Sequence, residues 1–112
     1  MHFFVDKSIT INNCVYSFDF DIRKVLEYQN YYIVLLSIPF DSNCINNLYC
    51  LDDKANVIWQ AEDLNKLFPK FTNLPYEQMG IKNDKLFASD FYGKNYMINL
   101  LNGAVEGYTI VK

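Results

Sequence analysis

The sequence has few of the residues from which catalytic and metal sites are usually built. It contains one histidine, His2, and three cysteines at positions 14, 44 and 50, whose spacing fits no CxxC metal or redox pattern. A Ser–His–Asp or Cys–His arrangement would therefore lack a base on a rigid element. The sequence predicts reduced structural thiols in a protein that is not an enzyme and that holds no metal and no cofactor.

Other absences exclude further classes of function. The four glycines, at positions 80, 93, 103 and 107, form no GxxxxGK or GxGxxG phosphate-binding run. The sequence has thirteen acidic and ten basic residues. This balance argues against a nucleic-acid partner, because such binding needs clustered Lys and Arg. The sequence has no cationic leader followed by an apolar run and no apolar stretch of about 18 residues. We therefore expect a cytoplasmic protein that does not bind a membrane.

Paired carboxylates are the remaining catalytic alternative. Asp19 and Asp21 lie two residues apart in a polar turn, and Asp52 and Asp53 begin another turn. Glycosidases use two carboxyl groups that face each other across a cleft. Aspartates in turns more often accept backbone hydrogen bonds, so the pattern favours a structural role. An enzyme that uses Asp19 and Asp21 stays open as a third hypothesis.

The residues that are present predict one domain, residues 1–112, made almost entirely of strands. A chain of 112 residues can bury roughly two-thirds of the surface that its unfolded state exposes, and half of its residues are hydrophobic. The runs 14–18 and 22–28 flank a polar turn and read as a hairpin. The run 31–38 is almost continuously apolar, which is typical of a central strand covered on both faces, and Pro39 ends it.

Residues 47–60, NLYCLDDKANVIWQ, predict a second hairpin, and further strands are expected near the C-terminus. Two apolar strands flank the turn 53–56, with residues 48, 50 and 52 on one face and residues 49 and 51 on the other. A polar loop over 41–47 precedes this hairpin. One short helix is expected over 61–68, because apolar residues have helical spacing there and Pro69 ends the run. Strands are expected over 77–81, 85–91, 95–100 and 104–112, the last after an Asn102–Gly103 turn.

Together these segments predict an all-β fold with one minor helix. We expect a curved antiparallel meander of about eight to ten strands, arranged as a propeller-blade-like sandwich or half-barrel. The two halves of the chain resemble each other weakly, since each contains successive antiparallel strands of the kind found in one propeller blade.

One stretch carries a resemblance to a known repeat. LYCLDDKANVIWQ resembles the blade repeat of quinoprotein-type β-propellers, in which a Leu–Tyr–x–Leu–Asp strand precedes a polar turn and an apolar strand that ends in Trp. The matching positions are Leu48, Tyr49, Leu51, Asp52, Val57, Ile58 and Trp59. The resemblance implies a local blade architecture. It does not imply quinone binding, because the chain lacks the closed ring and the metal ligands of those enzymes.

The whole chain resembles the small acidic immunity proteins of bacterial toxin systems, including those of contact-dependent growth inhibition. The shared features are size, acidity, aromatic content, an Ile58–Trp59–Gln60 hairpin end and a Phe68–Pro69 after a short helix. This resemblance implies a non-enzymatic immunity protein that covers the active or substrate-binding surface of a cognate toxin, with a nuclease domain as the expected toxin. It also implies a monomer in complex with that toxin.

Aromatic and acidic residues supply the candidate partner-binding set. Aromatics make up 17% of the chain, more than one small core usually needs, and protein interfaces are rich in them. Acidic neighbours would complement a basic toxin. The set comprises Asp52, Asp53, Trp59, Glu62, Asp63, Tyr76, Asp90 and Tyr92. Two alternatives stay open: Trp59 lies in the core and Asp63 caps the helix, or the protein is a structural module that self-associates or adds strands to a larger β-protein.

Overall fold

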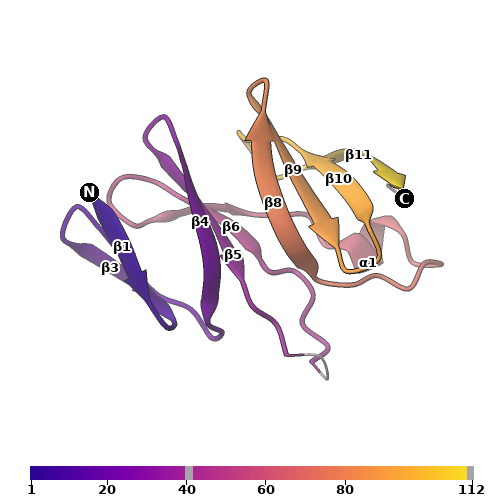
Figure 1. The fold of residues 1–112 in the computed structure, drawn as a ribbon, viewed down its shortest axis with the longest axis horizontal. Helices are drawn as coiled ribbons and strands as arrows, with labels where there is room; N and C mark the ends of the chain where they lie inside the picture. Colours follow the sequence, from indigo (N-terminus) through magenta and orange to yellow (C-terminus); the bar gives the residue numbers. More distant parts are fainter. Residues whose placement is uncertain (40–41, 111–112) are drawn as a thin grey trace.

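The computed structural model describes residues 1–39 and 42–110, which form eleven strands and one short helix (Figure 1). The elements are β1 (His2–Val5), β2 (Ser8–Ile11), β3 (Cys14–Ser17), β4 (Ile22–Tyr28), β5 (Tyr31–Leu36), β6 (Leu48–Leu51), β7 (Val57–Gln60), α1 (Leu64–Leu67), β8 (Tyr76–Lys82), β9 (Lys85–Asp90), β10 (Lys94–Ile98) and β11 (Val105–Ile110). The predicted all-β fold with one minor helix is confirmed. Of the predicted loop and last strand, residues 41, 111 and 112 lie outside the described residues.

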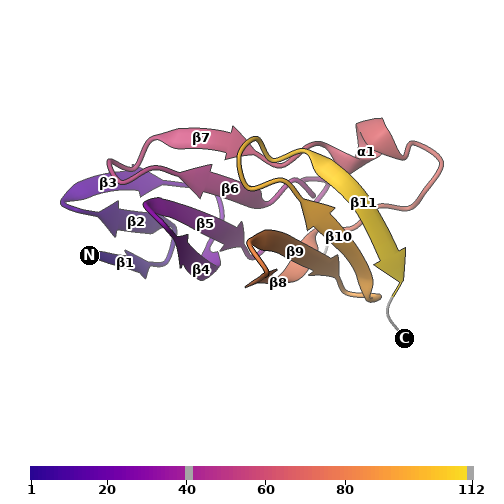
Figure 2. The same ribbon diagram turned by 90° about the horizontal axis from the view of Figure 1, so that it is seen from above.

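The strands form three antiparallel sheets whose strand order follows the chain. The first sheet is β1-β2-β3, the central sheet is β4-β5-β6-β7, and the C-terminal sheet is β8-β9-β10-β11. Figures 1 and 2 show the three sheets one after another along the long axis of the molecule. Each four-stranded sheet is a consecutive meander, as in a propeller blade. The predicted antiparallel meander is therefore confirmed, and the structure divides it into three separate sheets.

The predicted hairpin of residues 14–18 with 22–28 is wrong. β3 pairs with β2, and β4 pairs with β5. Asn12 and Asn13 both have positive φ, 48° and 69°, and so form the tight two-residue turn that joins β2 to β3. The polar turn around Asp19 instead carries the chain from the first sheet to the central sheet. Strands β1 and β2 are the two that sequence patterns did not predict.

Strand β5 is covered on both faces, as its apolar run predicts. Ile33 and Leu35 belong to a hydrophobic core shared with the C-terminal sheet. Tyr32, Val34 and Leu36 belong to a second core shared with the first sheet. All five residues are at most 5% exposed. The central sheet is therefore the middle layer of three.

Strand β6 has the predicted alternation, but both of its faces are core faces. Leu48 and Cys50 lie in the core shared with the C-terminal sheet, whereas Leu51 lies in the core shared with the first sheet. The turn after β6 is the predicted polar turn, in which Ala55 has a φ of 63°. Asp52 Oδ1 accepts hydrogen bonds from the backbone N–H groups of Lys54 and Asn56, both at 2.9 Å.

The helix is shorter than predicted and occupies only the second half of the range 61–68. Ala61 and Glu62 stay extended because their backbone N–H groups donate to Leu48 O and Gly103 O, at 2.9 and 3.0 Å. Asp63 is the N-cap, and its carboxylate accepts a hydrogen bond from the N–H of Asn65. Across residues 1–39 and 42–110, no helix is long and apolar enough to cross a bilayer.

Candidate functional site

Four connections between strands come together at one end of the sheets. They are residues 18–21, 37–47, 61–75 and 91–93, and we call this region the loop end, of which residues 40 and 41 are not described. In an antiparallel meander, every second connection between strands lies at the same end of the sheet. These four segments are therefore found at one end (Figure 1). Two grooves open between them.

The first groove is polar and has a volume of about 280 Å³. Two carboxylates, Asp19 and Asp63, contribute to its wall together with the phenol of Tyr49. Its remaining lining is mostly amide side chains and aliphatic groups: Asn43, Asn46, Asn47, Gln60, Asn65, Phe20, Leu36, Ile38, Cys44 and Ile45. This combination offers hydrogen-bond acceptors and donors with a net negative charge.

The second groove is larger, about 570 Å³, and more apolar. Phe91 and Tyr92 stand on its rim with 75% and 77% of their surface exposed, and their rings pack edge to face at 5.5 Å. Among the described residues of its lining, Glu77 supplies the one carboxylate. The other lining residues are Pro39, Ser42, Asn43, Ile45, Asn65, Asn73, Leu74 and Pro75. The two grooves share Asn43, Ile45 and Asn65, so they adjoin.

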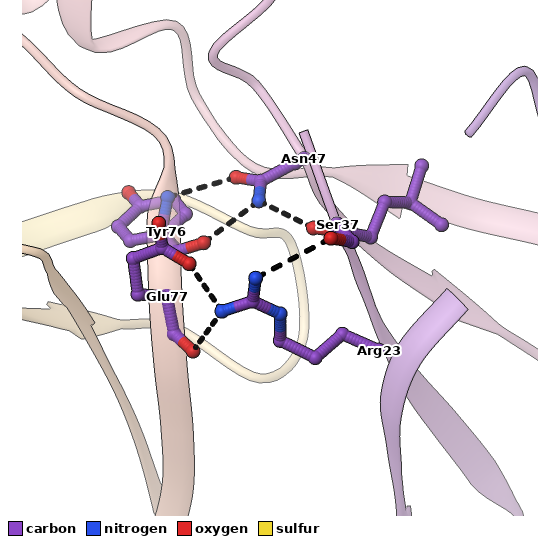
Figure 3. A network of polar contacts seen from close by, with 6 residues as sticks. Arg23, Ser37, Asn47, Tyr76 and Glu77 are labelled. Atoms are coloured by element: carbon purple, nitrogen blue, oxygen red, sulfur yellow. Dashed lines mark hydrogen bonds and ion pairs between the residues drawn. The ribbon is translucent and has the colours of Figure 1, made fainter. Parts of the chain in front are cut away.

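Asn47 ties the loop end of the central sheet to the C-terminal sheet (Figure 3). Its side chain is 1% exposed. Its Nδ2 donates to Leu36 O and to Tyr76 O, both at 2.8 Å, while its Oδ1 accepts from the N–H of Tyr76 at 3.0 Å. One side chain thus satisfies three backbone groups at the ends of β5 and β8. These bonds fix the part of the polar groove that Asn47 lines.

Arg23 on β4 forms a second link beside Asn47. Its guanidinium pairs with the carboxylate of Glu77 and donates to Glu77 O at 3.2 Å and to Ser37 Oγ at 3.3 Å (Figure 3). A charge-assisted contact to a planar guanidinium restricts the rotamers of Glu77. The carboxylate on the wall of the second groove is therefore held in place.

Two of the predicted partner-binding residues line the grooves, and a third, Asp90, holds the turn beside them. Asp63 lines the polar groove, although its carboxylate also caps α1. Tyr92 lines the apolar groove. Asp90 is 8% exposed, and its Oδ1 accepts from the N–H groups of Tyr92 and Lys94 at 2.9 and 3.0 Å. Asp90 thus shapes the turn that presents Phe91 and Tyr92.

The structure places two predicted residues in the core. Trp59 is 6% exposed, and its Nε1 donates to Leu100 O at 2.9 Å. Tyr76 is 1% exposed and packs edge to face on Tyr96 at 5.6 Å. Burial raises the pKa of Tyr76 far above its ordinary value, with smaller contributions from Tyr96 and Asp90. Neither residue is presented on the surface.

The other three predicted residues lie away from the grooves. Asp52 and the exposed Asp53 belong to the turn between β6 and β7, where Asn12 Nδ2 donates to Asp53 O. Hydrogen bonds, chiefly from the backbone of Asn56, lower the pKa of Asp52. Glu62 is exposed and accepts a hydrogen bond from the N–H of Val105 at 2.8 Å. The eight residues therefore form no single patch.

Sequence patterns missed Glu77, Phe91 and Asn47 as residues of the site. The adjacent pair Phe91–Tyr92 directly before Gly93 was the available signal, because two aromatic residues in a tight turn cannot both point into one core.

The two aspartates of the catalytic hypothesis lie in different surroundings. Asp19 lines the polar groove, whereas Asp21 is exposed and its backbone carbonyl accepts a hydrogen bond from Ser37 N. Within residues 1–39 and 42–110, no three His, Cys, Asp or Glu side chains have a metal-binding arrangement.

Residues 2–110 match the family model described as Domain of unknown function (DUF7957). The chain belongs to this family. The DUF7957 match covers all three sheets and the whole loop end, so the grooves lie within the family domain. Comparisons with curated proteins and with solved structures gave no match.

Proposed function

We propose that this DUF7957 domain is a non-enzymatic immunity protein that acts in the cytoplasm as a monomer. It binds a cognate bacterial toxin, for which we expect a basic nuclease domain, and covers the active or substrate-binding surface of that toxin. The observation that carries the proposal is the pair of adjoining grooves at the loop end, with two aromatic residues, each about three-quarters exposed, on the rim of the apolar groove.

The aromatic pair has the properties of an interface anchor. Phe91 and Tyr92 are among the most exposed large side chains of the described residues, and large aromatic side chains dominate binding energy at protein interfaces. The turn that carries them is held by Asp90, whose carboxylate accepts two backbone hydrogen bonds. Rigid presentation lowers the entropy that is lost on binding.

The charges around the grooves favour a basic partner. Asp19 and Asp63 line the polar groove, whereas the Glu77 carboxylate on the apolar groove is already paired with Arg23 and adds no net charge. The chain as a whole has a formal net charge of −3. Complementary charges accelerate association and fix the register of a complex, and salt screens them. A nuclease domain has the basic cleft that such a surface fits.

The test is co-purification of the tagged protein from its own bacterium at low and high salt, with partners identified by mass spectrometry. We expect a stoichiometric basic partner that kills cells lacking this protein, and less capture at high salt. The variant F91S/Y92S should lose the partner. The matched control Phe3→Ser removes an aromatic side chain that is 55% exposed on the first sheet, away from the grooves, and should retain it. If both variants lose the partner, or if neither does, the loop end is excluded as the binding site.

A structural module that self-associates or adds strands to another β-protein is the second candidate. It is favoured by the first sheet, where Phe3, Val5 and Val15 are 55–64% exposed on the face that points away from the central sheet. Pairing through backbone edges and apolar faces hardly responds to salt. Salt-insensitive self-association, measured by sedimentation, would favour this candidate over the immunity function.

A further inference from the structure

Four aromatic rings surround the ammonium group of Lys94 next to the loop end. Lys94 Nζ lies 3.8 Å from the ring centroid of Phe71 and 4.4 Å from that of Tyr108. The centroids of Phe68 and Tyr96 follow at 5.4 and 5.5 Å. Each ring lies within the range of about 6 Å over which a ring face attracts a cation. Among the described residues, no carboxylate forms a salt bridge with Lys94, so the rings are the main partners of this charge.

The rings contact one another as well as the lysine. Phe68 stacks on Phe71 at 5.5 Å and meets Tyr108 edge to face at 5.3 Å. Tyr96 is fully buried and packs against Phe68 and Tyr108. They come from the end of α1, the segment that follows it, β10 and β11; Figure 2 shows α1 beside β11. These ring–ring contacts do not involve Lys94, so they favour the same arrangement of the rings when the lysine is absent.

The cluster is open on one side. Phe71 and Tyr108 are 44% and 40% exposed, and Lys94 is half-buried. Asn73, which lines the apolar groove, donates hydrogen bonds to Phe68 O and Phe71 O at 3.0 and 3.4 Å, so the cluster lies beside that groove. A cationic side chain of a bound protein could therefore reach the rings from solvent.

We propose that Phe68, Phe71, Tyr96 and Tyr108 form a binding cage for ammonium and guanidinium groups, that Lys94 is its built-in occupant, and that an arginine or lysine side chain of the partner replaces it. The replacement step rests on the proposed function; the cage does not. Cation–π attraction acts on any accessible cation, and a guanidinium is less strongly hydrated than the lysine ammonium that it would displace.

Titration of the isolated chain with tetramethylammonium chloride, followed by NMR of the aromatic protons, tests the cage. The Lys94→Ala variant should bind this probe saturably and at least about tenfold more tightly than the wild-type protein, whose cage is filled. The variant K94A/F71L/Y108L, which keeps the apolar volume but removes the two exposed rings, should lose about tenfold in affinity. A folded Lys94→Ala protein that binds no more tightly than wild type would overturn the cage, as would binding that survives loss of the two rings.

The resonances of Lys94 test its occupancy and its replacement. In the free protein, ring currents should shift the ε-CH₂ protons of Lys94 upfield, and unshifted protons would overturn the proposal. In the complex with the partner, these protons should return to the positions of an exposed lysine. A complex that forms while Lys94 stays shifted would overturn the replacement and leave the immunity function intact. The titrations with small cations do not depend on finding a toxin, so the two proposals fail separately.

Discussion

The central and C-terminal sheets have the same four-strand meander but different surroundings. In the central sheet, five consecutive residues of β5 are buried, from Tyr32 to Leu36. In the C-terminal sheet, β9 alternates: Leu86, Ala88 and Asp90 are buried, whereas Phe87 and Ser89 between them are half-buried. A sheet in the middle of a stack needs apolar side chains on both faces, whereas an outer sheet needs them on one. The pattern of buried and exposed side chains along a strand therefore indicates the layer in which the strand lies.

The largest expected effect comes from removing a side chain of the middle layer. Leu35→Ala should lower the free energy of unfolding by about 2–5 kcal/mol, because it leaves a cavity in a close-packed core. The matched substitution Met97→Ala removes a half-buried side chain from the outer face of the C-terminal sheet and should lower it by less than about 1 kcal/mol. Urea denaturation measures both. Equal losses would refute the assignment of a middle and an outer layer.

The next effect tests the link between the two sheets. Asn47→Ala leaves the N–H and C=O of Tyr76 and the C=O of Leu36 without their partner, which should destabilise the fold by about 3 kcal/mol. Asn46→Ala is the control, since Asn46 Oδ1 has no hydrogen-bond partner within the described residues. Thermal unfolding distinguishes the variants. If Asn46→Ala is as harmful as Asn47→Ala, the link does not hold the sheets together.

A smaller effect tests a contact between the outer edges of the same two sheets. Gly103 has a φ of +76°, and an added Cβ would lie 2.6 Å from Cε3 of Trp59. Gly103→Ala should therefore cost about 1–3 kcal/mol and change the fluorescence of Trp59. At Gly107 in β11 an added Cβ has no neighbour within 4 Å, so Gly107→Ala should be nearly neutral. A neutral Gly103→Ala would show that Trp59 is not packed against this turn.

The last effect appears only at alkaline pH. Burial is the main cause that raises the pKa of the Cys50 thiol from its ordinary value of 9.0 to about 12. The folded state favours the neutral thiol over the thiolate. The contribution of Cys50 to the free energy of unfolding is therefore complete below about pH 9 and is lost as the pH rises towards 12. Burial also raises the pKa of Tyr96 to about 12, and this adds to the loss. Urea midpoints between pH 7 and 11 should fall less steeply for Cys50→Ala than for wild type, whereas the exposed Cys44→Ala should follow wild type.

Sequence patterns predicted the strands of the central sheet well, because the residues that specify these strands and turns are neighbours in the chain. The apolar run of β5 and the turn after Asp52 depend on neighbouring residues only. Strands β1 and β2 have only four residues each, HFFV and SITI, so the apolar run of the one and the alternation of the other are too short to identify a strand. Trp59 packs against Gly103, which lies in the turn between β10 and β11 of another sheet. No local signal reports such a contact.

The candidate site was predicted only in part for the same reason. Tyr92 and Asp63, chosen from composition, do line the grooves, and Asp90 holds the turn that carries Tyr92. Glu77 and Asn47 belong there because β4, β5 and β8 bring their ends together, with partners 54 and 29 residues away in the chain. Residues at such distances become neighbours only through the stacking of sheets, which the sequence pattern of a single strand does not specify.

The chain-order topology of the sheets bears on how quickly the protein can reach its native state. Every backbone ladder joins strands that are consecutive in the chain, so the native contacts within each sheet close short loops. All-β proteins whose contacts are distant in sequence fold slowly, over milliseconds to seconds, because long loops must close before any contact rewards them. Here every strand ladder can close without a distant segment, and contacts between sheets, such as the bonds of Asn47 and Arg23, are the ones that require distant segments to meet. Short-range assembly also limits the time for which unpaired strand edges are open to other chains during synthesis.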